Sequence, residues 1–411
     1  MMGFCIWKEG MDMPEKTFFT LIRHAHVYAP EDLGVTDFLI AGEKIAAMGS
    51  GVEAPKGAAC RTVDLAGARV LPGFIDSHVH MIGGGGEGGP HTRTPELLLS
   101  KVTVCGVTTL AGLLGTDGVT RHVESLLAKA RALETEGLST YIYTGAYQLP
   151  DTPTITGSVR KDIVVIDKCI GAGEIAMSDH RSGQPSVQDY RYIAAQARVG
   201  GMISGKAGLI NMHMGNGTDG LKVLFAITES GEIPKTQFLP THMNRKRSLF
   251  EEGFAWAKAG GYIDITSGIN PEDPGSEGAV KPATAVREAL EAGVPLERIT
   301  MSSDGNGSMP VFDAAGNPIG VGVGDEKTMF TEFRDMVEKE KLPIGQAIQV
   351  LTANVAKAMQ IYPKKGTVGA GRDADFIVIT EDFLLQHVWA RGQQMVADGK
   401  PIVFGTFEPK E

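Results

Sequence analysis

The residues best suited to chemistry are two histidines in the segment PGFIDSHVH, residues 72–80. They are His78 and His80, and they follow the apolar run of a predicted strand. Because successive side chains of a strand point to opposite faces, residues two positions apart share one face. Both imidazoles can therefore enter the coordination sphere of a single metal ion, and imidazole is a common ligand of Zn²⁺.

Three further side chains that can bind metal follow apolar runs later in the chain. They are His213 in LINMHMG, His242 in FLPTHMN and Asp304 in TMSSDGNG. In a barrel of parallel strands the C-terminal strand ends converge on one mouth, so residues far apart in the sequence meet there. A lone buried histidine is usually structural. Four histidines and an aspartate at four strand ends instead indicate a site for Zn²⁺ or a similar divalent ion.

A second pair of histidines with the same spacing, His24 and His26 in IRHAHVY, offers a competing metal site. Arg23 precedes this pair, and neither an acid nor a glycine-rich loop follows it closely. We expect this pair not to bind metal.

Two kinds of segment would position these residues. The two ends of the chain contain short β-rich runs and turns, whereas the middle alternates apolar strand candidates with amphipathic helical segments. Strand–helix alternation over the whole middle of the chain favours a closed barrel of parallel strands. A dinucleotide-binding sheet is the weaker alternative, because no G-x-G-x-x-G turn opens the alternation. We predict an α/β fold with a (β/α)8 TIM-like barrel over residues 72–362. A small β-sandwich domain would be built from both chain termini, residues 1–71 and 363–411.

The composition restricts the partners and the compartment. The chain has 411 residues, of which 42% are hydrophobic, and a formal net charge of -10. Because nucleic acids and anionic membrane surfaces attract clustered Lys and Arg, we expect neither as a partner. The four cysteines lie without a CxxC pair, which predicts reduced, buried thiols in a cytoplasmic protein; they are Cys5, Cys60, Cys105 and Cys169.

The N-terminal segment MMGFCIWKEGMDMPEKTFF does not have the pattern of a signal peptide, because Lys8 and Glu9 interrupt its apolar residues. No segment approaches the ~18 consecutive apolar residues of a membrane-spanning helix. We expect the first dozen residues to form a disordered extension. The 53 glycines follow no collagen-like period, so they indicate many tight turns.

Several motifs resemble a known family. PGFIDSHVH, MHMG, PTHMNR and SSDGNGS resemble the amidohydrolase superfamily, and HVHMIGGGGEGGPHTRTPE, LLGTDG, TGAY and SDHRS resemble its bacterial isoaspartyl dipeptidases, or β-aspartyl peptidases. The resemblance implies a (β/α)8 barrel with a small β-sandwich, a binuclear zinc site and a homo-oligomer, an octamer in the family. By this resemblance His78, His80 and Asp304 hold one zinc, and His213 and His242 hold the other.

One position departs from the family pattern. Relatives carry a lysine before the SDHR string whose carboxylated amine bridges the two metals, and here Glu174 stands at that register in GAGEIAMSDHR. A glutamate carboxylate has the same charge and two oxygens, so we predict that Glu174 bridges the two ions, with the strand or the metals lying closer. The alternative is a surface acid and a lost metal site. Lys168 is an unsuitable substitute, because it falls in a predicted helix on a different face.

The resemblance also implies a mechanism. Two divalent ions that share a water would lower its pKa and supply a bridging hydroxide near pH 7. Asp304 would act as the general base and then as the general acid. Tyr147 in TGAYQLP would polarise the scissile carbonyl, unless it only packs in its loop.

The remaining family contacts concern the substrate. An isoaspartyl dipeptide has a free α-ammonium and a free α-carboxylate beside the bond to be cut. The resemblance implies that Glu87 pairs with the ammonium and that the glycines let a backbone carbonyl such as that of Gly85 approach the ligand; a flexible lid is the alternative. Guanidinium groups grip carboxylates, and the matching cations and hydroxyls are Arg181, Arg245, Thr116 and Ser308.

Two other classes of protein are open alternatives. An N-acyl-amino-acid deacylase, a cyclic amidase or a deaminase of the same superfamily would keep the metals but change the substrate. Glu87, Arg181 and Arg245 together favour a substrate with one ammonium and two carboxylates. A scaffold protein that has lost its ligands is the non-catalytic alternative, which the intact ligand set disfavours. The sequence therefore predicts a zinc-dependent isoaspartyl dipeptidase.

Overall fold

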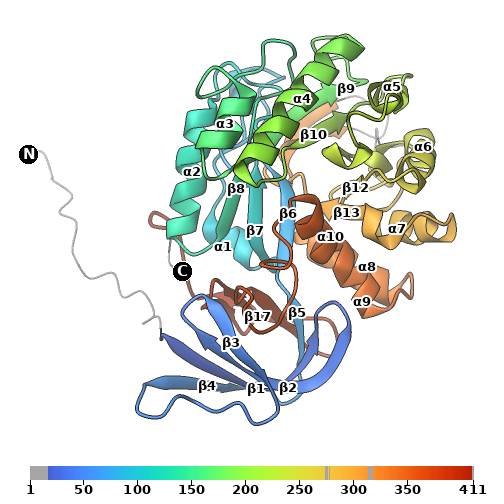
Figure 1. Ribbon diagram of the computed structural model, residues 1–411. Coiled ribbons are helices and arrows are strands. Elements are labelled where there is room, and N and C mark those ends of the chain that lie inside the picture. Colours follow the sequence, from blue (N-terminus) through green and yellow to red (C-terminus); the bar gives the residue numbers. More distant parts are fainter. Residues whose placement is uncertain (1–16, 274–275, 277, 313–317, 410–411) are drawn as a thin grey trace, which may run out of the picture.

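The computed structural model describes residues 17–273, 276, 278–312 and 318–409 (Figure 1). The expected N-terminal extension and Cys5 lie outside the described residues. A large barrel lies above a smaller sheet domain in Figure 1, and strands from both ends of the chain lie together in the smaller domain.

Eight parallel strands of the described chain surround the barrel axis. Six of them form one sheet in sequence order, and the last two pair with each other; they are β6 (Phe74–Val79), β7 (Val107–Gly112), β8 (Ser139–Thr144), β9 (Cys169–Met177), β10 (Leu209–Met214), β11 (Phe238–Thr241), β12 (Ile263–Thr266) and β13 (Ile299–Ser302). A parallel bridge between Val79 and Gly305 joins the end of β6 to the segment after β13. Thr241 Oγ1 donates to Asp264 Oδ2 over 2.8 Å between β11 and β12. The predicted (β/α)8 barrel is confirmed.

Helices follow the strands and cover the outside of the barrel (Figure 1). They are α1 (Leu99–Thr103), α2 (Val123–Thr135), α3 (Val159–Val165), α4 (Val187–Ser204), α5 (Lys222–Thr228), α6 (Arg247–Lys258), α7 (Pro282–Glu291), α8 (Lys327–Glu338), α9 (Ile344–Leu351) and α10 (Ala353–Ala358). The longest, α4, begins at a reciprocal capping box between Ser186 and Asp189 and ends at Gly205, whose φ of 68° closes the last turn. A short hairpin, β14 (Ser308–Phe312) and β15 (Pro318–Val323), precedes α8.

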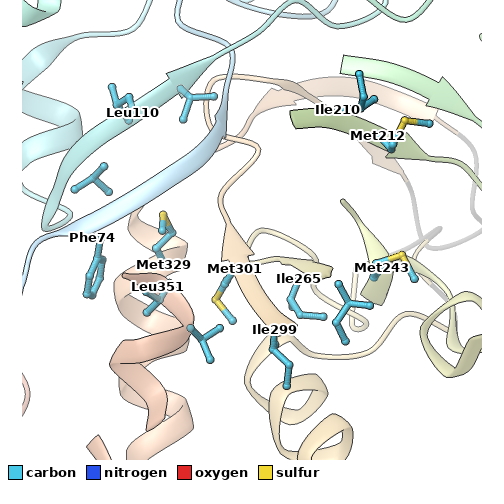
Figure 2. Close-up of a cluster of buried hydrophobic side chains, with 14 of the residues drawn as sticks. Phe74, Leu110, Ile210, Met212, Met243, Ile265, Ile299, Met301, Met329 and Leu351 are labelled. Atoms are coloured by element: carbon cyan, nitrogen blue, oxygen red, sulfur yellow. The ribbon is translucent and has the colours of Figure 1, made fainter. Parts of the chain in front are cut away.

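The main hydrophobic core lies between the strands and the helices. Every residue of β6, β7, β9 and β10 is buried, which explains why these strands appear in the sequence as continuous apolar runs. Figure 2 shows part of this core, in which Phe74 and Leu110 come from the strands and Met329 and Leu351 come from the helices. Each fully buried apolar side chain of this kind contributes about 1.5–3 kcal/mol. The core therefore supplies the rigid frame on which the strand ends sit.

The small domain is a mixed sheet of nine strands with its own core. Its strands are β1 (Phe19–Tyr28), β2 (Asp32–Ala41), β3 (Lys44–Gly49), β4 (Cys60–Asp64), β5 (Arg69–Pro72), β16 (Phe376–Ile379), β17 (Leu385–Ala390), β18 (Gln393–Ala397) and β19 (Lys400–Pro401). The antiparallel pair of β5 and β16 joins the two ends of the chain. In the core, Phe376 stacks on Trp389 with ring centroids 4.8 Å apart, and Phe38 packs edge-on against Phe376. This is the predicted β-sandwich domain.

The histidine pair of the first strand has other partners. His24 has a φ of 50° and interrupts the register of β1 with β2, so it does not share a face with His26 in the regular way. The His24 ring lies 2.9 Å from Asp64 Oδ1, and the His26 ring lies 2.8 Å from Asp32 Oδ1. The two imidazoles therefore interact with different carboxylates.

The cysteines are free wherever the structure describes them. Cys105 and Cys169 are buried, as predicted, but Cys60 is only half-buried because it begins β4, which pairs with β1 alone. Within the described ranges, no helix combines the length and the apolar character that crossing a membrane requires.

Candidate active site

The six predicted metal ligands meet at one end of the barrel. His78 lies in β6, His80 follows it, Glu174 lies in β9 and His213 lies in β10. The remaining two, His242 and Asp304, follow β11 and β13. Because the strands are parallel, their C-terminal ends open onto the same mouth, as the sequence analysis expected.

Glu174 is the centre of this cluster. Its Oε1 atom lies 2.7 Å from His213 Nδ1, 3.2 Å from His242 Nε2 and 3.5 Å from His78 Nε2. The side chain is 1% exposed, so the alternative of a surface acid is wrong. The carboxylate therefore lies next to imidazoles that the family resemblance assigns to two different metals.

Asp304 completes the other side of the cluster. Its Oδ1 atom lies 3.1 Å from His80 Nε2 and 3.4 Å from His78 Nε2. The rings of His78 and His242 are 5.3 Å apart, and those of His213 and His242 are 4.7 Å apart. Four imidazoles and two carboxylates thus share one small buried volume.

This donor set fits divalent cations. Both ring nitrogens of His78, His80 Nδ1 and Glu174 Oε2 are buried without a hydrogen-bond partner. Such atoms are costly unless something satisfies them, and imidazole nitrogens and carboxylate oxygens are the ligands that Zn²⁺ prefers. Three overlapping groups of ligand atoms each lie within 4.8 Å of one another; they are His78, His242 and Asp304; His78, His80 and Glu174; and Glu174, His213 and His242.

Two of these residues have a left-handed backbone that aims their side chains. The φ angle is 61° at His242 and 57° at Asp304. A residue other than glycine in this region costs of order 1–3 kcal/mol, so surrounding contacts must hold it. His242 Nδ1 lies 2.8 Å from Thr266 Oγ1, and Asn306 donates its side-chain amide to the carbonyl of His80 over 3.0 Å. Such residues also occur elsewhere in the described chain, among them Ala66 and Gln360, so the conformation aims these two side chains but does not by itself mark the site.

The electrostatics hold His242 and Glu174 in the states that bind cations. Burial lowers the pKa of His242 to about 3, so its ring is neutral at pH 7. Burial alone would raise the pKa of Glu174, but the neighbouring His78 and His213 hold it well below its usual value. Glu174 is therefore an anion at the centre of the cluster.

Tyr147 lies directly beside the cluster. Its hydroxyl oxygen is 2.7 Å from His213 Nδ1, and the Arg181 guanidinium lies over its ring, 5.2 Å from the centroid. Burial, with the charge of Glu174, raises the pKa of Tyr147 well above 10. The phenol therefore keeps its proton and can donate a hydrogen bond.

A second group of predicted residues lies around Glu87. Thr116 Oγ1 donates to Glu87 Oε1 over 2.9 Å, and Arg181 Nη1 lies 3.3 Å from the same atom. Ser308 Oγ lies 3.5 Å from Glu87 Oε2. Arg245 is set deeper, where its Nη1 donates to the carbonyl of Met214 over 2.6 Å. The structure thus brings an anion, two cations and two hydroxyls to the same side of the metal cluster.

The glycine-rich loop that carries Glu87 is anchored. Gly85 has a φ of 72°, and a Cβ there would lie 2.6 Å from the carbonyl oxygen of Thr92, so only glycine fits. The sequence analysis missed Arg121, which is buried and donates to the carbonyls of Ile82 and Gly84. This guanidinium anchors the first part of the loop, which disfavours the alternative of a free lid.

The sequence analysis also missed Asp179. It belongs to the SDHRS string in which Arg181 attracted notice, and its Oδ2 atom lies 3.1 Å from His213 Nε2. Its place in that string, two positions before Arg181, was the available signal.

Lys168 lies outside the metal cluster, as predicted. The prediction that it belongs to a helix is wrong. It occupies the turn before β9, where its ammonium donates to the carbonyl of Thr140 over 3.1 Å and pairs with Glu134 at 2.7 Å. Thr140 lies at the N-terminal end of β8, away from the mouth. Its position rules Lys168 out as a bridge in place of Glu174.

Comparison with known proteins identifies relatives that match most of the chain. The Amidohydrolase family model matches residues 273–395. L-hydantoinase of Paenarthrobacter aurescens is 22% identical over 426 residues, which cover 89% of this chain and 86% of that protein. Dihydropyrimidinase of Brevibacillus agri is 17% identical with a TM-score of 0.65, covering 94% of this chain and 97% of the other, a likeness of fold alone.

A much nearer relative is β-aspartyl dipeptidase of Fervidobacterium islandicum AW-1, whose structure holds a β-Asp-Leu dipeptide. It is 44% identical to this chain, with a TM-score of 0.86, and the match covers 96% of this chain and 100% of the relative. At this identity and coverage, the chain belongs to the β-aspartyl dipeptidase family of the amidohydrolases.

Proposed function

We propose that this protein is a dipeptidase that uses two divalent metal ions, most simply Zn²⁺, to hydrolyse β-aspartyl dipeptides. The observation that carries the proposal is the buried Glu174 carboxylate, which lies within 3.5 Å of nitrogens of three histidines. The β-Asp-Leu dipeptide held by the Fervidobacterium relative supports the substrate class.

The chain's residues divide the work of hydrolysis. When bound, the two cations supply Lewis acidity and lower the pKa of water. Glu174 would hold them as a bridging carboxylate in place of a carboxylated lysine. Asp304 would accept the proton of the attacking water and return it to the leaving amine. Tyr147, which keeps its phenolic proton, would donate to the carbonyl oxygen as that oxygen gains negative charge.

The residues beside the metal cluster would recognise the substrate. Glu87 would bind the free α-ammonium, and Arg181 and Arg245 would bind the two carboxylates through paired hydrogen bonds. Glu87 and Arg181 lie 3.3 Å apart, so they neutralise one another before the substrate arrives. A zwitterionic head group can insert between them and exchange partners with little change in net charge. By family membership we also propose a homo-oligomer, which light scattering would test.

A cyclic amidase is the second candidate. The similarity to L-hydantoinase supports it, although that identity is only 22%. A hydantoin ring has neither an ammonium nor a carboxylate, so it would form no ion pair with Glu87, Arg181 or Arg245. These charged groups would then contribute little to substrate binding, which makes this candidate the weaker one.

The decisive experiment combines substrates with metal content on one preparation. We expect hydrolysis of β-Asp-Leu, little activity on N-acyl amino acids or hydantoins, and two bound divalent ions per chain. Glu174→Gln should lose one ion and most activity. Hydantoin hydrolysis without β-Asp-Leu hydrolysis would favour the cyclic amidase, and a chain without bound metal would revive the scaffold alternative.

A further inference from the structure

A single carboxylate joins the metal cluster to the residues around Glu87. Asp179 is buried in the loop that follows β9, and its two oxygens are shared between two residues. Oδ2 lies 3.1 Å from His213 Nε2 and accepts from Arg181 Nη2 over 3.0 Å. Oδ1 accepts from Arg181 Nε over 3.0 Å and from the Arg181 backbone N–H over 2.8 Å.

The first consequence concerns the tautomer of His213. Its Nδ1 atom faces Glu174 Oε1, so metal binding on that side requires the proton to sit on Nε2. Two guanidinium nitrogens, from Arg181 and Arg245, lie 3.1 Å from Nε2 and can only donate, which favours the opposite tautomer. Asp179 is the acceptor that keeps the proton on Nε2. It leaves Nδ1, which also lies 2.7 Å from the Tyr147 hydroxyl, without a proton.

The second consequence concerns Arg181. Asp179 engages Nε and Nη2 of its guanidinium side by side, which fixes the plane of the group. The free Nη1 then points to Glu87, 3.3 Å away. The same carboxylate thus orients a metal ligand and a substrate-binding cation.

We propose that Asp179 is a positioning residue that couples occupation of the metal site at His213 to recognition of the substrate carboxylate by Arg181. The part that concerns substrate rests on the proposed function, whereas the part that concerns metal does not. Loss of a carboxylate that orients a metal-binding histidine lowers metal affinity 10- to 100-fold in known sites.

The test uses the purified full chain, with Zn²⁺ affinity measured by competition with a chromophoric chelator and with kcat and KM measured on β-Asp-Leu. For Asp179→Ala we expect one of two Zn²⁺ ions to bind about 10- to 100-fold more weakly and KM to rise. Asp179→Asn keeps an acceptor for His213 but no charge for Arg181. It should therefore restore much of the metal affinity while KM stays high.

A matched control is Asp167→Asn, in the turn before β9, whose carboxylate is 74% exposed and pairs only weakly with Arg131 at 3.5 Å. Asp167→Asn should change neither the Zn²⁺ affinity nor KM. Two Zn²⁺ ions at unchanged affinity in Asp179→Ala, or an unchanged KM in both variants, would overturn the proposal. If Asp179→Ala fails to fold, Asp179→Asn carries the test. If the unaltered enzyme does not cleave β-Asp-Leu but Asp179→Ala still loses Zn²⁺ affinity, the proposed function fails while the metal part of this inference stands.

Discussion

Replacement of Glu87 by glutamine tests how the enzyme would recognise its substrate. Glu87→Gln keeps the size of the side chain and the hydrogen bond from Thr116, but it removes the negative charge that would face the substrate ammonium. The value of kcat/KM should therefore fall for substrates that have this ammonium and stay unchanged for substrates that lack it.

The exposure of Glu87 in the structure sets the size of the expected fall in kcat/KM. A hydrogen bond to a charged group contributes about 1.5–3 kcal/mol. The Glu87 side chain is 34% exposed, so water screens part of this interaction and the lower half of the range applies. The loss of about 1.5–2 kcal/mol corresponds to a fall of roughly 10- to 30-fold in kcat/KM for β-Asp-Leu. Loss of the Glu87 partner also frees Arg181, which limits the fall.

The assay compares kcat/KM for β-Asp-Leu with that for its N-acetyl derivative, in the wild type and in Glu87→Gln. The ratio should move toward the acetylated substrate by the predicted factor, because only β-Asp-Leu carries the ammonium. Glu96→Gln is the matched control, since Glu96 is 63% exposed and pairs with Lys129 at 3.2 Å. Equal losses on both substrates would refute the assignment of Glu87 to the ammonium.

Three further outcomes are expected. Tyr147→Phe should lower kcat about 100- to 1,000-fold with little effect on bound metal, because it removes one donor to the developing oxyanion; an unchanged kcat would remove Tyr147 from the mechanism. Chelated protein should regain both ions and activity with Zn²⁺ alone, and a requirement for bicarbonate would mean that a carboxylated lysine, not Glu174, is the bridge. Lys365→Met should lower the free energy of unfolding by about 3–5 kcal/mol in urea titrations, because it leaves two buried carboxylates, Asp373 at 2.9 Å and Asp375, without their buried cation. Burial alone would raise the pKa of Asp373, but Lys365 holds it below 3.8, so this contribution is present above pH 3.8 and is lost as the pH falls through the lowered value. An unfolding free energy of Lys365→Met that matches the wild type at pH 7 would contradict this account.

Much of the candidate site could be predicted from local sequence. An apolar run followed by a histidine or an aspartate marks the C-terminal end of a strand, and parallel strands bring such ends together whatever their separation in the chain. His213, His242 and Asp304 could be found in this way because each signal is confined to a few neighbouring residues. The same argument identified the barrel and the β-rich ends.

Other features depended on tertiary contacts. The H-x-H pattern of His24 and His26 is the same as that of His78 and His80, yet a break in the register of β1 turns the first pair toward separate carboxylates. Arg121 carries no local motif, and the SDHRS string that contains Asp179 drew attention only to Arg181. The contacts that distinguish the two residues are with carbonyls 27 to 39 positions away from Arg121 and with an imidazole 34 positions away from Asp179. The sequence alone determined which side chains could bind metal and which strands would carry them. Only the tertiary structure decided that Glu174 is buried among three imidazoles, since burial and distance are set by the packing of the whole barrel and by no single segment.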